Sequence, residues 1–248
     1  VLAVGLGLGT KTFDLLPDHW KTYEAEVTFG VQTDTEDIWG NVLKIHDVSK
    51  TPEEIIQAIC SFGGTYDQVP PMYSAKKIDG KKLYQLAREG KIVERKAVPV
   101  TLKDIQVLSV KDNKARFIVT CSAGTYIRTL CVDIGKKLGC EACMSSLTRV
   151  MAGGFSKEQA LTLEKIKELA DKNELESHLI SIDTALGHFP KVIASNEFEK
   201  QLKNGNAISS NAVLGLQEAS IDVCSHDICV RLYLNNNGLD EFIGVYHL

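Results

Sequence analysis

Tyr126 and Arg128 stand two residues apart, just after Gly124 and close to the end of an apolar stretch. The preceding segment, 115–121, alternates its residues as a strand with two different faces does. If 124–128 is still extended, the tyrosine ring and the guanidinium project from the same face of the chain. This pairing suits a flat, polar ligand. A core tyrosine beside a surface ion pair would give the same pattern, so this stretch alone leaves both interpretations open.

Residues 76–96 are the basic part of the chain, with eight Lys or Arg against three acidic residues in a protein whose formal net charge is -4. Tyr73 and Tyr84 lie beside and within this run. A basic segment with aromatic side chains is typical of an RNA-facing surface, although a solvated helix face explains the charge equally well. The candidate phosphate-binding side chains are Lys76, Lys77, Lys81, Lys82 and Arg88.

Two further clusters could bind a metal. Asp34, Glu36 and Asp37 precede Gly40, but a calcium loop needs a longer ligand series with a closing Glu, so a solvated polar turn is favoured. Cys140 and Cys143 form a CxxC without a second pair at zinc-site spacing, which favours helical thiols packed in a core. No metal site is therefore predicted.

The first residues, VLAVGLGLGTK, contain three alternating glycines and begin inside an apolar run without an initiator Met. A nucleotide-binding loop is disfavoured, because no third fingerprint glycine opens a helix and no acidic residue follows the next strand. We expect residues 1–8 to form a buried strand or the end of one. We also expect the chain to be a fragment that lacks an upstream part.

Local patterns predict the elements that position these residues. Alternation predicts a half-buried strand over 21–29 and an antiparallel pair over 98–108 and 115–121. The Thr-Pro-Glu-Glu run from Thr51 predicts a capped helix start, and a second helix is predicted to run to Leu138 with Gly139 as its C-cap. A third, amphipathic helix is predicted over 162–175.

Beyond residue 185 the pattern changes to that of a small β-rich module, with a short capped helix over 196–201 and a hairpin of 228–234 and 242–246 closed at Gly238. The 248 residues are 44% hydrophobic, enough for a substantial core. No apolar run approaches the ~20 residues of a membrane span, and no signal peptide is recognisable. Seven cysteines without framework spacing favour free thiols in the cytoplasm.

Four motifs, three of them long, together resemble the bacterial-type tRNA pseudouridine synthase II family, the TruB family. They are KTYEAEVTFGVQTDTEDIWG, VPPMYSAKKIDGKKLYQLAREG, CSAGTYIRTLCVDIGKKLG, and LTR with the Gly-Phe that follows it. The resemblance implies an α+β pseudouridine synthase fold with a mixed, mostly antiparallel sheet over 1–185, including an RNA-binding insertion over 66–98. Residues 186–248 are similar to the family's PUA module, which binds tRNA.

The resemblance also implies a function. The family isomerises the T-loop uridine of tRNA without a metal or organic cofactor, and the expected partner is the tRNA T-arm, with no obligate protein partner indicated. Tyr23 matches the tyrosine that stacks on the target base, and Tyr126 and Leu147 match other substrate-pocket residues. Arg128 matches the arginine that pairs with the catalytic Asp, and Lys11 matches a lysine near the pocket. An extruded uracil needs such a π-face and apolar walls.

The sequence departs from the family at its nucleophile. The catalytic Asp belongs to a GG-T-L-D-P-x-A-T-G motif that would end immediately before Val1. The resemblance does not place Asp34 or Asp37 in that role, since both match another motif. We therefore expect this chain to bind tRNA without isomerising it and to leave Arg128 without its carboxylate partner. The alternative function is that of a non-catalytic protein that binds or folds RNA.

Overall fold

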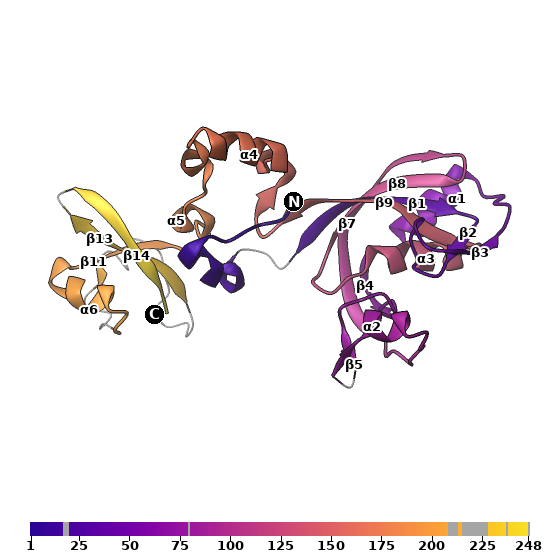
Figure 1. The fold of residues 1–248 in the computed structure, drawn as a ribbon, viewed down its shortest axis with the longest axis horizontal. Coiled ribbons are helices and arrows are strands. Elements are labelled where there is room, and N and C mark those ends of the chain that lie inside the picture. Colours follow the sequence, from indigo (N-terminus) through magenta and orange to yellow (C-terminus); the bar gives the residue numbers. More distant parts are fainter. Residues whose placement is uncertain (17–19, 79, 208–212, 215–227, 237, 248) are drawn as a thin grey trace. The chain divides into compact units, whose positions relative to one another are not determined.

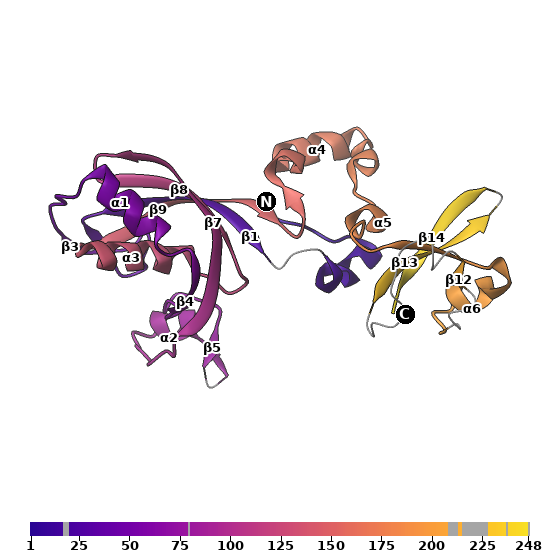
Figure 2. The same cartoon turned by 180° about the vertical axis from the view of Figure 1, so that it is seen from behind.

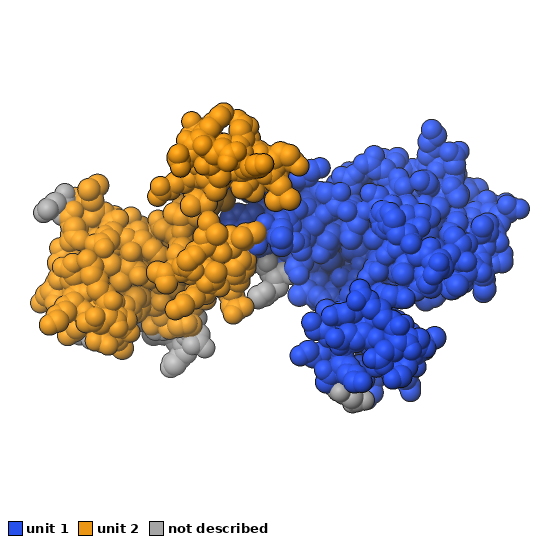
Figure 3. All heavy atoms as spheres, in the orientation of Figure 1, with its two compact units in different colours: residues 1–3, 18–160 blue, residues 4–17, 161–248 orange. Residues whose placement is uncertain are grey.

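The computed structural model describes residues 1–248 except 17–19, 79, 208–212, 215–227, 237 and 248. The chain divides into two compact units, one of residues 1–3 and 18–160 and the other of residues 4–17 and 161–248 (Figure 3). This division falls after Ala160, earlier than the domain border predicted between 185 and 186. The predicted border is not tested by it and stays a prediction.

A six-stranded antiparallel sheet in the order β10-β9-β1-β8-β7-β4 forms the first unit. Its central strand pairs Tyr23 with Val119 on one side and with Arg149 on the other. The views from both sides show β1, β8 and β9 next to one another (Figures 1 and 2). The strands are β1 (Lys21–Phe29), β4 (Gly64–Gln68), β7 (Val98–Lys111), β8 (Lys114–Cys121), β9 (Ala142–Ala152) and β10 (Phe155–Ser156).

Two helices, α1 (Pro52–Cys60) and α3 (Ile127–Leu138), pack on one face of this sheet and share its apolar core. Thr51 begins α1 with a capping box, in which Glu54 N–H donates to its Oγ1 over 3.2 Å and Thr51 N–H donates to Glu54 Oε2 over 2.8 Å. Gly139 ends α3 in the left-handed region, with φ +70°. Both predicted caps are confirmed, because each depends on residues close together in sequence.

The opposite face of the sheet is polar. Lys114 Nζ lies 3.1 Å from Glu26 Oε1, and Arg116 pairs with Glu24. The buried face of the same strand carries Ala25, Val27 and Phe29, so the predicted alternation over 21–29 is confirmed. Cross-strand pairs of this kind stabilise a solvated sheet face modestly.

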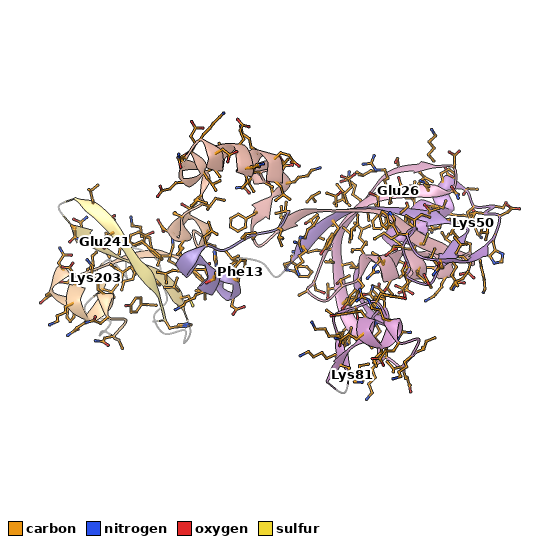
Figure 4. The ribbon with its side chains drawn as sticks, in the orientation of Figure 1. Phe13, Glu26, Lys50, Lys81, Lys203 and Glu241 are labelled. Atoms are coloured by element: carbon orange, nitrogen blue, oxygen red, sulfur yellow. The ribbon has the colours of Figure 1, made fainter. Side chains whose placement is uncertain are left out.

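Residues 69–97 leave the sheet after β4 and return to it in β7. They contain the short strands β5 (Lys77–Ile78) and β6 (Lys81–Lys82) and the helix α2 (Leu83–Arg88). Leu83 and Leu86 are buried and anchor α2. This part stands out as a lobe of the first unit, with Lys81 near its tip (Figures 3 and 4). A second hairpin, β2 (Val31–Thr33) with β3 (Val42–Ile45), follows β1.

The second unit contains a four-stranded sheet in the order β12-β11-β13-β14, which confirms the prediction of a small β-rich region. Its strands are β11 (Lys191–Ala194), β12 (Val213–Leu214), β13 (Cys229–Asn236) and β14 (Leu239–His247), and β11 runs parallel to β13. Leu202 of α6 (Glu199–Lys203) packs into its core. Lys203 Nζ lies 3.4 Å from Glu241 Oε1 and ties this helix to the hairpin (Figure 4).

Several local predictions were wrong. Residues 1–6 form no strand, and Leu2, Val4 and Leu6 are exposed; the 3₁₀ turns η1 (Gly7–Lys11) and η2 (Phe13–Leu15) follow. The helix expected over 162–175 is the shorter α4 (Leu163–Asp171). The capping box expected at Asn196 does not form, because a 3₁₀ turn, η5 (Asn196–Phe198), precedes α6. The other short elements are η3 (Lys157–Gln159), η4 (Leu175–His178) and α5 (Ile182–Ala185).

Candidate functional site

Helix α3 begins directly after Tyr126, so Arg128 lies in its first turn. Gly124 reverses the chain with φ +83°, and Thr125 Oγ1 donates to the Ser122 carbonyl over 2.9 Å. The prediction that Tyr126 and Arg128 project from one extended face was therefore wrong, because the side-chain period changes from two to 3.6 at the residue between them. Both still lie at the junction of β8 with α3, where the sequence placed them.

The Arg128 guanidinium donates to acceptors from two separate segments. Nη1 lies 3.0 Å from Asp37 Oδ2 and 3.2 Å from the Thr35 carbonyl, and Nη2 lies 2.8 Å from the Tyr73 carbonyl. The side chain is 24% exposed. A guanidinium has five N–H groups, so two of them, including Nε–H, have no hydrogen-bond partner within the described residues. Arg128 thus retains two N–H groups for a further acceptor.

Asp37, which the sequence analysis assigned to a solvated turn, holds Arg128. Its Oδ1 accepts from Thr35 Oγ1 over 2.8 Å and from Trp39 N–H over 3.3 Å, and its side chain is 15% exposed. The turn is attached to β9, since Ile38 N–H donates to the Met144 carbonyl over 2.8 Å. The ion pair with Asp37 does not test whether Arg128 lacks its catalytic carboxylate partner, which stays a prediction. A partly buried arginine requires acceptors, but the sequence does not show which ones, because Asp37 lies 91 positions from Arg128.

Glu36 lies beside this ion pair and also points inward. Its backbone adopts φ +67°, which is uncommon for a residue with a side chain, and its Oε2 accepts from Thr129 Oγ1 over 2.6 Å. Burial raises the pKa of the Glu36 carboxyl above its ordinary value, while the Thr129 hydroxyl and the nearby Arg128 oppose that shift. The two carboxyl groups therefore connect the turn to α3 at two successive positions.

Gln68, which the sequence analysis did not single out, contacts the main chain of Tyr126. Tyr126 N–H donates to Gln68 Oε1 over 2.8 Å, and Gln68 Nε2 donates to the Tyr126 carbonyl over 3.1 Å. The glutamine is completely buried, and the tyrosine is half-buried. No local sequence signal identifies such a residue, because its partner lies 58 positions away.

Tyr23 and Leu147 lie on the neighbouring strands β1 and β9. Leu147 pairs with Ala25, two residues from Tyr23, and is 39% exposed. Tyr23 is half-buried against the core, and burial raises the pKa of its hydroxyl above the ordinary 10.0. The end of β8 pairs with the start of β1, so Tyr23 lies near the junction that carries Tyr126, whereas Leu147 lies midway along β9.

The remaining predicted residues fall in two places. Lys11 lies in η1, which belongs to the second unit, so its position near the pocket stays a prediction. The five basic candidates lie on the lobe formed by 69–97, where Lys77, Lys81 and Arg88 are exposed and the others half-buried. The side chains of Lys82 and Arg88 lie 5.7 and 5.4 Å from the centre of the Tyr84 ring. Within the described residues, none of the five makes a salt bridge.

The two cysteines of the CxxC motif were expected to lie on a helix, but neither does. Cys140 lies in the turn after α3, and Cys143 is buried in β9, where burial raises the pKa of its thiol. The cysteines in the described ranges are free thiols, and these ranges contain no group of three or more His, Cys, Asp or Glu side chains arranged to hold a metal ion. None of the described helices has both the length and the apolar character needed to cross a membrane.

Comparison with known families gives a match along most of the chain. Residues 1–127 match the family model of the TruB family pseudouridylate synthase N-terminal domain. The chain belongs to the TruB family. Residues 128–187 match the model of the tRNA pseudouridylate synthase B C-terminal domain.

Relatives in the TruB family cover almost all of this chain. The tRNA pseudouridine synthase B of Alkaliphilus oremlandii is 43% identical over 98% of this chain and 78% of its own length. The protein of the same name from Clostridium novyi is 44% identical over 99% of this chain and 80% of its own. The chain thus spans about four fifths of each relative.

Solved structures confirm the predicted fold class. A chain of a Cbf5–Nop10–Gar1 complex is similar with a TM-score of 0.62 and 21% identity over 98% of this chain and 70% of that one. A chain of an archaeal box H/ACA Nop10–Cbf5 complex gives a TM-score of 0.61 with 18% identity over 98% and 63% of the two chains. At these identities the likeness shows the shared α+β fold alone.

Proposed function

We propose that this chain binds tRNA through its T-arm and that the site around Arg128 receives the T-loop uridine for isomerisation to pseudouridine. The observation that carries the proposal is the 43–44% identity to tRNA pseudouridine synthases B along nearly the whole chain. The free thiols are compatible with a cytoplasmic enzyme. The PUA-like region over 186–248 would add contacts to the tRNA.

The geometry supports a division of roles among the candidate residues. The Tyr23 ring would stack on the flipped uracil, with Leu147 and Tyr126 as further walls of the pocket, because an extruded base needs a π-face and apolar surroundings. The two remaining N–H groups of Arg128 would hold the attacking carboxylate ionised and oriented, since charge-assisted hydrogen bonds favour the ionised form. The glycosidic bond from N1 to the ribose then breaks, and the uracil rotates and bonds to the ribose through C5. C5 loses its proton, N1 gains one, and the carboxylate is released. None of these steps needs a metal or cofactor.

Asp37 is better suited to holding Arg128 than to attacking the nucleoside. Both of its oxygens accept hydrogen bonds, Oδ2 from Arg128 and Oδ1 from Thr35 and Trp39. A carboxylate occupied in this way is a poor nucleophile, because attack would require these bonds to break. The GG-T-L-D-P-x-A-T-G motif does not occur in the 248 residues. We therefore propose that this polypeptide binds tRNA but does not isomerise it alone.

The first test measures pseudouridine in tRNA by mass spectrometry after incubation with two proteins. One is this polypeptide, and the other, called the extended chain below, carries a segment with the GG-T-L-D-P-x-A-T-G motif before Val1. We expect pseudouridine only from the extended chain, while both bind tRNA. Turnover by the polypeptide alone would overturn the assignment of the nucleophile to that motif. An inactive extended chain that still binds tRNA would favour the non-catalytic RNA-binding function.

A second test concerns the lobe of residues 69–97. Replacing Lys76, Lys77, Lys81 and Lys82 together by Ala should weaken tRNA binding and reduce its salt dependence by roughly one unit of log–log slope for each lost phosphate contact. The matched control replaces Lys44, Lys50, Lys114 and Lys136, which already pair with carboxylates of this chain. Filter binding over a salt series measures both. If the salt dependence of tRNA binding has the same slope in the two quadruple variants, the lysines of the lobe do not contact phosphates and the lobe is a solvated surface.

A further inference from the structure

The side chain of Gln68 is completely buried at the end of β4, and every polar atom of its amide is engaged. Oε1 accepts from Tyr126 N–H over 2.8 Å, while Nε2 donates to the Tyr126 carbonyl over 3.1 Å and to Tyr66 Oη over 2.5 Å. A buried amide is costly without such partners. The Gln68 side chain therefore binds both the backbone N–H and the backbone carbonyl of Tyr126.

Gln68 contacts the start of α3 at a residue that does not itself cap the helix. Tyr126 is the N-cap of α3, but an aromatic ring cannot accept a hydrogen bond from the first turn as Ser or Asp does, and no side-chain cap is present. Its carbonyl also accepts from Leu130 N–H over 3.0 Å, the first bond of the helix. Gln68 thus fixes the residue from which α3 begins, and the orientation of the first turn follows from it.

Gln68 also starts the loop that receives Arg128. Residues 69–72 lead from it to Tyr73, whose carbonyl accepts from Arg128 Nη2 over 2.8 Å. Pro70 and Pro71 within this loop are buried, and Arg95 Nη1 donates to the Pro70 carbonyl over 3.0 Å. Two prolines restrict the backbone of so short a connection. One side chain therefore determines both where α3 begins and where the loop that holds Arg128 departs.

We propose that Gln68 is a positioning residue, which keeps Tyr126 and Arg128 in register for the isomerisation. The inference rests on the proposed function for its catalytic consequence, but not for its geometric one. Loss of the Gln68 contact should let the first turn of α3 shift relative to Tyr73 and Asp37. A misplacement of about 1 Å at a catalytic group can reduce a rate about 100-fold.

Two variants test the proposal on this chain. Gln68→Leu removes both contacts with Tyr126. Gln68→Glu keeps an acceptor for the Tyr126 N–H but, when ionised, sets a carboxylate against the Tyr126 carbonyl. Burial raises the pKa of a carboxyl group, and the protonated form can again donate to that carbonyl. The contact should therefore return as pH falls through the pKa of the introduced carboxyl group.

The first readout is the ¹⁵N NMR spectrum of the arginine guanidinium groups, with Arg128→Lys used to assign the Arg128 signals. We expect resolved Arg128 signals in the wild type, exchange-broadened signals in Gln68→Leu at every pH, and in Gln68→Glu signals that sharpen as the pH is lowered. Asn113→Ala is the matched control, because it removes an amide–carbonyl bond to Phe29, 3.0 Å long, elsewhere in the same unit. Its Arg128 signals should match the wild type.

The second readout is steady-state kinetics of the extended chain. Gln68→Leu should lower kcat about 100-fold with little change in KM, because most of the proposed tRNA contacts lie on the lobe and the C-terminal region. The proposal would be overturned if the Arg128 signals of Gln68→Glu did not change across the pH range. It would also be overturned if neither variant folded, because Gln68 would then have a purely structural role. If the wild-type extended chain is inactive, the proposed function is refuted. The positioning role of Gln68 can still be tested, since the NMR readout needs no turnover.

Discussion

Replacing Arg128 by Met in the extended chain should abolish detectable pseudouridine formation while leaving tRNA bound. The substitution keeps a flexible apolar side chain of roughly the length of the arginine stem but removes the three hydrogen bonds to Asp37, Thr35 and Tyr73 and the two N–H groups proposed to hold the nucleophile. Loss of one oriented electrostatic contact in an active site typically reduces kcat about 100- to 1,000-fold, and the loss of the whole group should exceed that. Single-turnover assays on tRNA measure the rate.

The same substitution should also lower stability. Arg128 and Asp37 are 24% and 15% exposed, so their pair is less buried than those whose disruption costs about 3–5 kcal/mol, and we expect a loss of about 2 kcal/mol. The Arg128→Met, Asp37→Asn double variant should recover part of that loss, because no unpaired carboxylate remains. Urea unfolding of the four proteins measures this coupling. Full activity of Arg128→Met would refute its role, and strictly additive stability changes would refute the ion pair.

Replacing Tyr23 by Leu should lower turnover of the extended chain about 10- to 100-fold, because stacking on a base contributes roughly 1–3 kcal/mol. Leucine keeps an apolar side chain against the core but presents no π-face. Tyr23→Phe is the matched control, since it keeps the ring and removes only the hydroxyl. Pseudouridine formation and thermal unfolding should be measured on both.

The comparison between the two variants separates a pocket residue from a core residue. If Tyr23 stacks on uracil, Tyr23→Phe retains most of the turnover and Tyr23→Leu loses it at nearly unchanged unfolding temperature. If Tyr23 serves only the core, turnover and stability will fall together in both variants. Equal turnover in the leucine variant and the wild type would remove Tyr23 from the proposed pocket.

Elements that depend on neighbours in sequence were predicted well. The strand over 21–29 and the pair of 98–108 with 115–121 were confirmed, because alternation of apolar and polar side chains is imposed by a sheet with one covered face. The caps at Thr51 and Gly139 were confirmed because a cap forms within one helical turn. Residues 1–8 were wrongly predicted as a buried strand, since an apolar run alone does not supply a partner strand.

The sequence by itself determined which side chains could serve the site: a guanidinium and a tyrosine at the junction of 115–121 with the following helix, and a basic segment with interleaved tyrosines. Only the tertiary structure decided how they are held. Arg128 meets Asp37 across 91 positions and Tyr126 meets Gln68 across 58, so no local pattern records either contact. A strand or cap needs only its neighbours, whereas a half-buried guanidinium takes acceptors from whichever loops the sheet order brings beside it.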